Sequence, residues 1–383
     1  MNAAPLAGLK VLELARILAG PWIGQTLADL GATVIKVEAP GGDDTRGWGP
    51  PFIERQEDKS AAYFYSANRG KMSIVADFKE AEDLALVKGL ANEADVLIEN
   101  FKVGGLKKYG LDFESLKSAN PELVYCSVTG FGQSGPYSER AGYDYLIQGM
   151  SGLMSVTGEA DGQPMKVGVA VTDIFSGLYG VIGVQAALAQ RGITGTGQHL
   201  DISLFDCATA IMANQAMNYL ATGNAPKKLG NQHPNIVPYQ VFDVRDGQVI
   251  LAVGNDGQFR RFCEVLNRND LASDARFQTN SDRVVHRDDL LPELSDAVKK
   301  YSKTKILSMM EQAVVPCAPI NSMAEVFADP QIVHRNMQIQ PEGIPGLRTP
   351  IIFSGATMQL QKTAPRLNQH GVKIKAKRWN AHN

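Results

Sequence analysis

The stretch LKVLELARILAGPWIGQTLADLGATVIKVEAPGG, residues 9–42, decides the fold class. Leu9–Leu14 is a short apolar run typical of a strand, Gly20–Leu30 has helical spacing, and Ala32–Glu38 is apolar and β-branched before a Pro-Gly-Gly turn. Strands that alternate with helices predict a parallel sheet covered on both faces, because each crossover helix packs back onto the sheet. The alternation continues in Ser73–Asp77, Glu80–Glu93, Asp95–Glu99, Phe113–Ala119 and Leu123–Thr129.

Dinucleotide binding is one interpretation of this opening, since Glu38 ends the second strand where an acidic residue would bind a ribose. The first strand-to-helix turn, Ala15–Pro21, contains only Gly20. The dinucleotide fingerprint needs a spaced set of glycines that lets the backbone approach the pyrophosphate closely. We therefore exclude a dinucleotide-dependent dehydrogenase.

The composition is that of an ordinary globular protein. The 383 residues carry a net charge of -2, with 44% hydrophobic and 20% charged residues, and offer no broad electrostatic footprint for nucleic acid or an anionic membrane. The four cysteines are far apart and the six histidines show no ligand spacing, so we expect reduced thiols and no metal site. We find no leader pattern and no uninterrupted apolar segment near about 18 residues, and expect a cytoplasmic protein.

Asp173 stands where an apolar run meets a predicted helix, in MKVGVAVTDIFSGLYGVIGVQAALAQR. We expect Thr172 or Asp173 to be the N-cap, because a short polar side chain there can accept a free backbone N–H. Each glycine inside a helix costs about 1 kcal/mol against alanine. Gly177, Gly180 and Gly183 therefore indicate a helix that another backbone or side chain approaches closely. Taken alone, the segment favours a structural role for Asp173, as the cap of a core helix, over a catalytic role.

The chain is long enough for two domains. Residues 223–239 are rich in Gly, Pro and Asn, which is typical of a linker. Residues 1–222 then form a large α/β domain, and residues 240–326 form a smaller α+β domain that opens with strands Tyr239–Val244 and Gln248–Val253. Residues 327–383 return to short strands and turns.

Nine motifs follow one another along the chain: Gly20-Pro21, Leu30–Glu38, Gly42–Arg46, Glu99–Phe101, Gly142–Asp144, Ser151-Gly152, Asp173, Thr194–Gln198 and Asp201–Asp206. Together they resemble the class III CoA-transferases, which include formyl-CoA transferase and carnitine CoA-transferase and are related to the alpha-methylacyl-CoA racemases. The resemblance runs from about Leu6 to His370. It implies a Rossmann-like large domain, to which residues 327–383 return, a small domain, and a homodimer of two interlocked chains.

The resemblance implies that Asp173 is the catalytic nucleophile. Its carboxylate would attack the thioester of an acyl-CoA, which gives an acyl-aspartyl anhydride and then an aspartyl-CoA thioester. This chemistry needs an ionised carboxylate, which pH 7 supplies if the pKa of Asp173 stays near about 4. A helix N-terminus would favour the ionised form.

The resemblance also implies how CoA is held, as a substrate and not as a permanently bound cofactor. The turn Ile17, Leu18 and Ala19 would lie against the adenosine and pantetheine parts, and Asn100 with Phe101 would line the pantetheine channel. Lys71 and Lys108 would approach phosphates, for which a compact ammonium is suited. The alternative for each lysine is a solvated surface charge.

A glycine-rich loop closes over the active site in formyl-CoA transferase, and the stretch from Gly254 to Gln258 resembles its position. Asn255 and Asp256 replace glycines of that loop, so Gly254 and Gly257 are the glycines that remain in this stretch. The alternative is an ordinary strand-to-helix loop with Asp256 as the N-cap.

The related racemases place a histidine where this chain has Tyr143. A neutral tyrosine with a pKa near about 10 is a poor proton acceptor at pH 7. Racemisation by two bases would lose one of them, so we expect CoA transfer and keep racemisation as the alternative enzyme activity. In a CoA-transferase, Tyr143 would pack on the thioester or bind the acyl carboxylate. A CoA-binding scaffold without activity is a third interpretation.

The segments Gly230–Phe242 and Cys317–Asn321 look most like the subgroup that handles dicarboxylates such as succinate and glutarate. Succinyl-CoA is then the expected donor. The second carboxylate of such a substrate needs a fixed cation. Our candidates are Arg16, Asn231 and His233.

Overall fold

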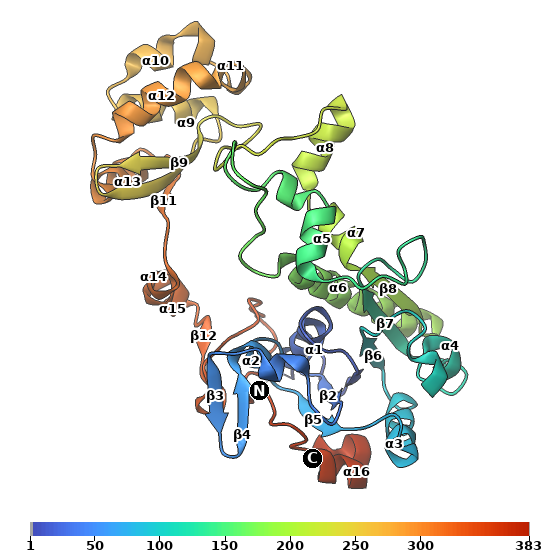
Figure 1. The fold of residues 1–383 in the computed structure, drawn as a ribbon. Helices are drawn as coiled ribbons and strands as arrows, with labels where there is room; N and C mark the ends of the chain where they lie inside the picture. Colours follow the sequence, from blue (N-terminus) through green and yellow to red (C-terminus); the bar gives the residue numbers. More distant parts are fainter. Residues whose placement is uncertain (1–2, 383) are drawn as a thin grey trace. The chain divides into compact units, whose positions relative to one another are not determined.

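Two compact units make up the chain in the computed structural model, which describes residues 3–382 (Figure 1). The first unit combines Met1–Leu153, Val167–Thr222 and Pro330–Asn383, and the second combines Met154–Lys166 with Gly223–Asp329. This division differs from the predicted one in three places. The expected linker 223–239 is grouped with the second unit, and so is Met154–Lys166, whose composition does not set it apart from its neighbours. The chain also returns to the first unit at Pro330 and not at residue 327.

A six-stranded parallel sheet forms the centre of the described part of the first unit. The order of its strands matches 3-2-1-4-5-6 counted from the N-terminus, which is the order of a Rossmann sheet. The predicted parallel α/β architecture is therefore confirmed. Across the sheet the strands are β5 (Met72–Val75), β2 (Thr33–Glu38), β1 (Lys10–Glu13), β6 (Val96–Glu99), β7 (Val124–Thr129) and β8 (His199–Ser203).

Alternate residues of the strands build one core on each face of this sheet. Strands that are buried on both faces appear in a sequence as continuous apolar runs, which is why these strands were predictable. One core receives Val11, Val34, Val96 and Val124, and the other receives Leu12, Ile35, Leu97 and Tyr125.

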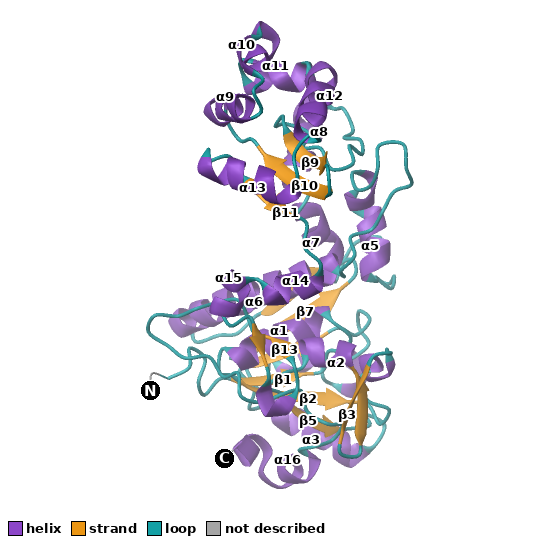
Figure 2. Cartoon of the chain, turned by 90° about the vertical axis from the view of Figure 1, so that its left-hand side faces the viewer, coloured by secondary structure: helices purple, strands orange, loops and turns teal. Residues whose placement is uncertain are grey.

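Helices cover both faces (Figure 2). On one face α1 (Ala19–Asp29) packs against α6 (Val171–Thr194), and on the other α3 (Ala81–Ala91) and α16 (Gly371–Lys377) join the core. The first unit also contains β3 (Phe52–Arg55), β4 (Asp58–Ala61), α2 (Ala62–Ala67), α4 (Phe113–Leu116), α5 (Asp144–Met150), α7 (Leu204–Ala210), α8 (Ala213–Thr222), α15 (Pro330–His334), β12 (Gln338–Ile339) and β13 (Gly346–Leu347).

The C-terminal segment is bonded to the first half of this unit. The backbone N–H of Asn368 donates to Ser73 Oγ at 3.0 Å, and Trp379 Nε1 donates to the Leu90 carbonyl at 3.1 Å. In Figure 1 this segment, coloured red, ends in α16 beside β5. Residues from Pro330 onward thus belong to the same unit as the N-terminal strands.

Helix α6 begins earlier than its sequence predicts. Ala170 occupies the N-cap position without a side-chain bond, so the expected cap at Thr172 or Asp173 is wrong and both residues lie in the first turn. Two of its glycines do allow a close approach: a Cβ on Gly180 would stand 2.3 Å from Ile23 Cδ1, and one on Gly177 would stand 3.0 Å from Trp22 Cβ. Among the described residues, α6 is the helix long and apolar enough to cross a bilayer, a property that core helices share.

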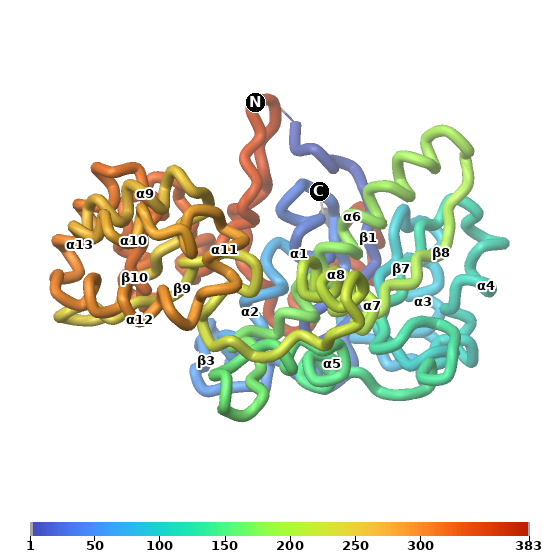
Figure 3. The backbone as a smooth tube through the Cα atoms, turned by 90° about the horizontal axis from the view of Figure 1, so that it is seen from above, coloured from blue at the N-terminus to red at the C-terminus, as the bar shows by residue number. Residues whose placement is uncertain are grey.

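The second unit has a three-stranded antiparallel sheet in its described part, in the order β11 (Cys317–Pro319), β10 (Gly247–Ala252) and β9 (Tyr239–Val244). Apolar side chains of this sheet pack with the helices into one core, as expected for a small α+β unit. Figure 3 follows the backbone of this unit, coloured yellow to orange, through β9, β10 and its helices. Its helices are α9 (Asp256–Val265), α10 (Asn269–Ser273), α11 (Asn280–Val285), α12 (Arg287–Val298), α13 (Lys303–Gln312) and α14 (Met323–Ala328).

Candidate active site

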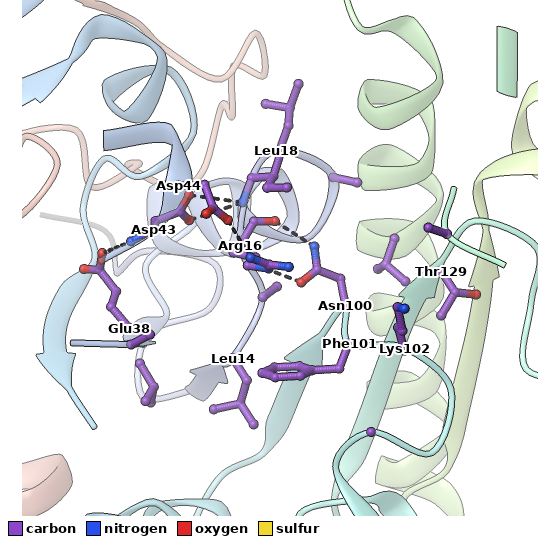
Figure 4. Close-up of a pocket in the computed structure, with 18 of the residues that line it drawn as sticks. Leu14, Arg16, Leu18, Glu38, Asp43, Asp44, Asn100, Phe101, Lys102 and Thr129 are labelled. Atoms are coloured by element: carbon purple, nitrogen blue, oxygen red, sulfur yellow. Dashed lines mark hydrogen bonds and ion pairs between the residues drawn. The ribbon is translucent and has the colours of Figure 1, made fainter. Parts of the chain in front are cut away.

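A pocket of about 970 Å³ opens in the first unit at the carboxyl ends of β1, β2, β6 and β7 (Figure 4). The strand order reverses between β1 and β6, and ligands of open α/β sheets bind at such a switch point. Residues from the loops after these strands meet there with the start of α6. The lining includes Ala15–Ala19, Ala39–Asp44, Asn100–Val103, Thr129-Gly130, Arg140–Asp144 and Asp173.

Asp173 lines this pocket from the first turn of α6. Burial, and then the carboxylate of Asp144, raise the pKa of Asp173 from 3.8 to about 7. The expectation of a pKa near 4 is therefore wrong, because burial outweighs the favourable effect of the helix N-terminus. A carboxylate with a raised pKa is a stronger nucleophile when it is ionised.

Asp144 holds the first turn of α6 in place. Its Oδ1 accepts from the backbone N–H of Thr172 at 2.8 Å and from Thr172 Oγ1 at 2.7 Å, and its Oδ2 accepts from Gln148 Nε2 at 2.7 Å. The sequence shows this residue only as part of the Gly142–Asp144 motif. Its two effects, on the position of Asp173 and on the pKa of Asp173, emerge only from the structure.

Tyr63 lies close enough to Asp173 to feel its charge, although it is not among the residues that line the pocket. Burial, followed by the nearby charges of Asp173 and Asp144, raises the pKa of Tyr63 to about 12, so its hydroxyl remains a donor at neutral pH. Its ring makes an edge contact with Trp48 at 5.4 Å between centroids. Tyr143, the residue that favoured transfer, lines the pocket just before α5 and is 57% exposed.

The turn 16–19, which contains the residues predicted to bind CoA, forms one wall of the pocket. Asn100 clamps it, because Asn100 Oδ1 accepts from the Arg16 N–H at 3.0 Å and Asn100 Nδ2 donates to the Arg16 carbonyl at 2.7 Å. Phe101 lies stacked on Phe78 with centroids 6.3 Å apart. Ile17, Leu18 and Ala19 line the pocket beside them, so the structure brings together the five residues expected at the adenosine and pantetheine parts: Ile17, Leu18, Ala19, Asn100 and Phe101.

The two lysines expected at phosphates differ sharply. Lys108 lines the pocket, as do Lys102 and Arg140. Lys71 is buried away from the lining, where its Nζ donates to Glu13 Oε1 at 2.9 Å and to two further oxygens. This placement argues against a phosphate contact by Lys71, whose partner stands 58 residues earlier in the chain.

Arg16 lies at the pocket, where Arg16 Nη1 pairs with Asp44 Oδ2 at 2.6 Å. The candidates Asn231 and His233 belong to the second unit. His233 is fixed there, since its Nδ1 accepts from the Asn235 N–H at 3.0 Å and its ring lies 5.2 Å from that of Tyr239.

The loop after β10 also belongs to the second unit. Asn255 caps α9, because its side chain accepts from the Gln258 N–H at 2.9 Å. The loop is therefore a capped strand-to-helix loop, as the alternative interpretation expected, but the cap is Asn255 and not Asp256. Gly254 donates its N–H to Gln258 Oε1 at 2.7 Å, and Gly257 lies in the first turn of α9.

Comparison with known proteins identifies the family. The model of CoA-transferase family III matches residues 6–371. A succinate–glutarate CoA-transferase of Agrobacterium fabrum is 55% identical over 97% of this chain and 95% of its own length, and the human succinyl-CoA:glutarate CoA-transferase is 39% identical over 97% and 86%. A CaiB/BaiF family protein of Brucella suis has a TM-score of 0.89 at 58% identity, covering 98% of this chain and 100% of that one. This chain therefore belongs to CoA-transferase family III and is a CoA-transferase, which decides against the racemase alternative.

Proposed function

We propose that this enzyme transfers CoA from succinyl-CoA to a second short dicarboxylate, with Asp173 as the covalent nucleophile. The observation that carries the proposal is the half-buried carboxylate of Asp173, with its raised pKa, in a pocket at the switch point of the sheet. The acids named for the Agrobacterium and human relatives, succinate and glutarate, are both dicarboxylates, and so is the mesaconate of a Haloarcula hispanica relative that is 36% identical.

The reaction proceeds by four exchanges at one carboxylate. Ionised Asp173 attacks the thioester carbonyl of the donor, the C–S bond breaks, and CoA leaves as a thiolate. The thiolate then attacks the aspartyl carbonyl of the anhydride, which releases the donor acid and leaves an aspartyl-CoA thioester. The acceptor carboxylate attacks that thioester and expels the thiolate again, and the thiolate finally attacks the acyl carbonyl, which frees Asp173 and forms the new acyl-CoA.

CoA lies along the wall formed by Ile17–Ala19 and Asn100-Phe101 in this proposal, because these residues line the same pocket as Asp173. Lys108, together with Lys102 and Arg140, supplies positive charge for its phosphates. Lys71 has no part in it.

A few further residues are proposed to bind the acyl groups and their second carboxylates. Tyr143 and Arg16 line the pocket and can donate to a carboxylate. Asn231, His233, Gly254 and Gly257 remain candidates from the second unit. The proposed enzyme is cytoplasmic and needs neither nucleic acid nor a membrane.

Trapping of the acyl-enzyme tests the covalent mechanism. After incubation with succinyl-CoA and treatment with hydroxylamine or borohydride, intact-protein mass spectrometry should show a modified chain, and peptide mapping should place the adduct on Asp173. The Asp173→Ala variant should give none. Asp206→Asn is the matched control, because Asp206 is an exposed carboxylate at the start of α7. An adduct that persists in Asp173→Ala would sink the assignment.

We also propose that two copies of the chain form the expected interlocked homodimer. Large apolar side chains are exposed along α5, α6 and α8 of the first unit, which is unusual for an isolated soluble chain. Light scattering in solution should give twice the mass of one chain at micromolar concentration, and a single-chain mass would contradict the proposal. The exposed side chains include Tyr145, Leu146, Ile182, Met217 and Leu220.

A further inference from the structure

The turn after β1 contains a strained residue. Ile17 has a φ of +74°, in the left-handed region that β-branched residues rarely enter because the Cβ crowds the backbone. Such a conformation persists only where the surroundings impose it, and it is found most often at binding and catalytic sites. Ile17 lines the pocket at the switch point of the sheet.

Side chains from distant parts of the chain hold this turn. The Ile17 N–H donates to both carboxylate oxygens of Asp43, at 3.3 and 3.2 Å, and the Ala15 carbonyl accepts from Lys36 Nζ at 2.8 Å. Asn100 binds the backbone N–H and C=O of the residue between them. Figure 4 shows Asp43 and Asn100 directed at the turn from opposite sides. A dinucleotide site uses glycines to shape this turn, whereas this chain uses charged and amide side chains.

Asp43 and Lys36 are themselves a buried ion pair. Lys36 Nζ lies 2.8 Å from Asp43 Oδ2, and the two side chains are 1% and 0% exposed. Although burial opposes ionisation of both, the charges of Glu13 and then Asp43 raise the pKa of Lys36, and the charge of Lys36 lowers the pKa of Asp43, so both stay charged. Burying such a pair is costly, and its best-attested use is to specify one arrangement of the chain and not to add stability.

Glu13 is a second buried carboxylate that bonds to Lys36, and it differs from Asp43 in its contact with the turn. Glu13 Oε1 also accepts from Lys36 Nζ, at 3.1 Å, and its side chain is equally buried. Glu13 is not among the residues that line the pocket, and its carboxylate also accepts from Lys71. Of the two buried carboxylates on Lys36, Asp43 is the one that bonds to the backbone of the turn.

We propose that Lys36 and Asp43 are positioning residues that hold the Ile17 turn in the conformation that binds CoA. Their effect then falls on the affinity for CoA and not on the covalent steps. This inference rests on the proposed placement of CoA along the turn. If only a fraction of molecules has the turn formed, the apparent affinity falls by that fraction.

The test compares Asp43→Asn in two backgrounds. In the native background we expect the KM for succinyl-CoA, and the Kd for CoA measured by calorimetry, to rise about tenfold with kcat changed less than about twofold. In the Ile17→Gly background the same substitution should raise both by less than about threefold, because glycine adopts a positive φ without strain. Glu13→Gln is the matched control and should lower the melting temperature while leaving the KM within about twofold.

The KM values of these variants decide whether Asp43 acts by holding the turn. An equal rise in KM in both backgrounds, or an equal rise in Glu13→Gln, would overturn the positioning role. If Asp43→Asn does not fold, Thr45→Val replaces it, because Thr45 Oγ1 donates to Asp43 Oδ1 at 2.7 Å and its loss leaves every charge in place. That variant should raise the KM about twofold to threefold at constant kcat, and an unchanged KM would also overturn the role. An unmodified enzyme that neither binds CoA nor transfers it would refute the proposed function instead.

Discussion

An Asp173→Asn variant is expected to bind CoA as tightly as the unmodified enzyme and to transfer it at least about 10⁴-fold more slowly. The substitution keeps the size of the side chain and its place in the first turn of α6, but an amide cannot form the anhydride. Removal of a covalent nucleophile typically eliminates most of the rate acceleration that the catalytic group supplies, which sets the expected magnitude.

Two measurements check this result. Calorimetry with CoA should give a Kd within about twofold of the unmodified value, and the transfer of CoA from succinyl-CoA to glutarate should be followed by chromatography of the acyl-CoA products. Asp206→Asn controls for the loss of a carboxylate elsewhere in the same unit. A variant that retains more than about a tenth of the native kcat would rule out covalent catalysis by Asp173.

The centre of the sheet was predictable because strands β2, β1, β6 and β7 are apolar runs that are mostly buried. The edge strand β8 instead alternates polar and apolar residues and is only partly buried. The hairpin β3–β4 was not predicted, since its sequence FIERQEDKSA lacks the length and the apolar pattern of a core strand. Helix α6 begins at Val171, after an N-cap at Ala170 that has no polar side chain, so its start carries no local signal.

The site was predictable only where residues follow one another in the chain. Asp173 and the turn Ile17–Ala19 stand in motifs, and the structure brings them to one pocket. The contacts of Asp144 with the first turn of α6 span the fold, and no local pattern encodes them. The burial of Lys71 likewise depends on a distant partner. The wrong pKa for Asp173 has the same cause, because its environment is assembled from several segments.

The raised pKa of Asp173 predicts a conflict between activity and stability. A carboxyl group whose pKa rises on folding binds its proton more tightly in the native state than in the unfolded state. Its stabilising effect is complete below the unfolded value near 3.8 and is lost as the pH rises towards about 7. A tenfold difference in proton affinity corresponds to about 1.4 kcal/mol, so ionised Asp173 should destabilise the fold by up to about 4 kcal/mol above pH 7.

Asp173→Asn should therefore be more stable than the unmodified enzyme, by an amount that grows between about pH 4 and 7 and is constant above it. Urea unfolding at several pH values measures this difference, and Asp206→Asn should show no such trend because its side chain is exposed. The kcat of the unmodified enzyme should rise over the same range, since only the ionised carboxylate attacks. Because one ionisation controls both properties, kcat should reach half of its plateau value near pH 7, which is where the stability difference stops growing, and a stability difference independent of pH would show that burial does not raise the pKa of Asp173.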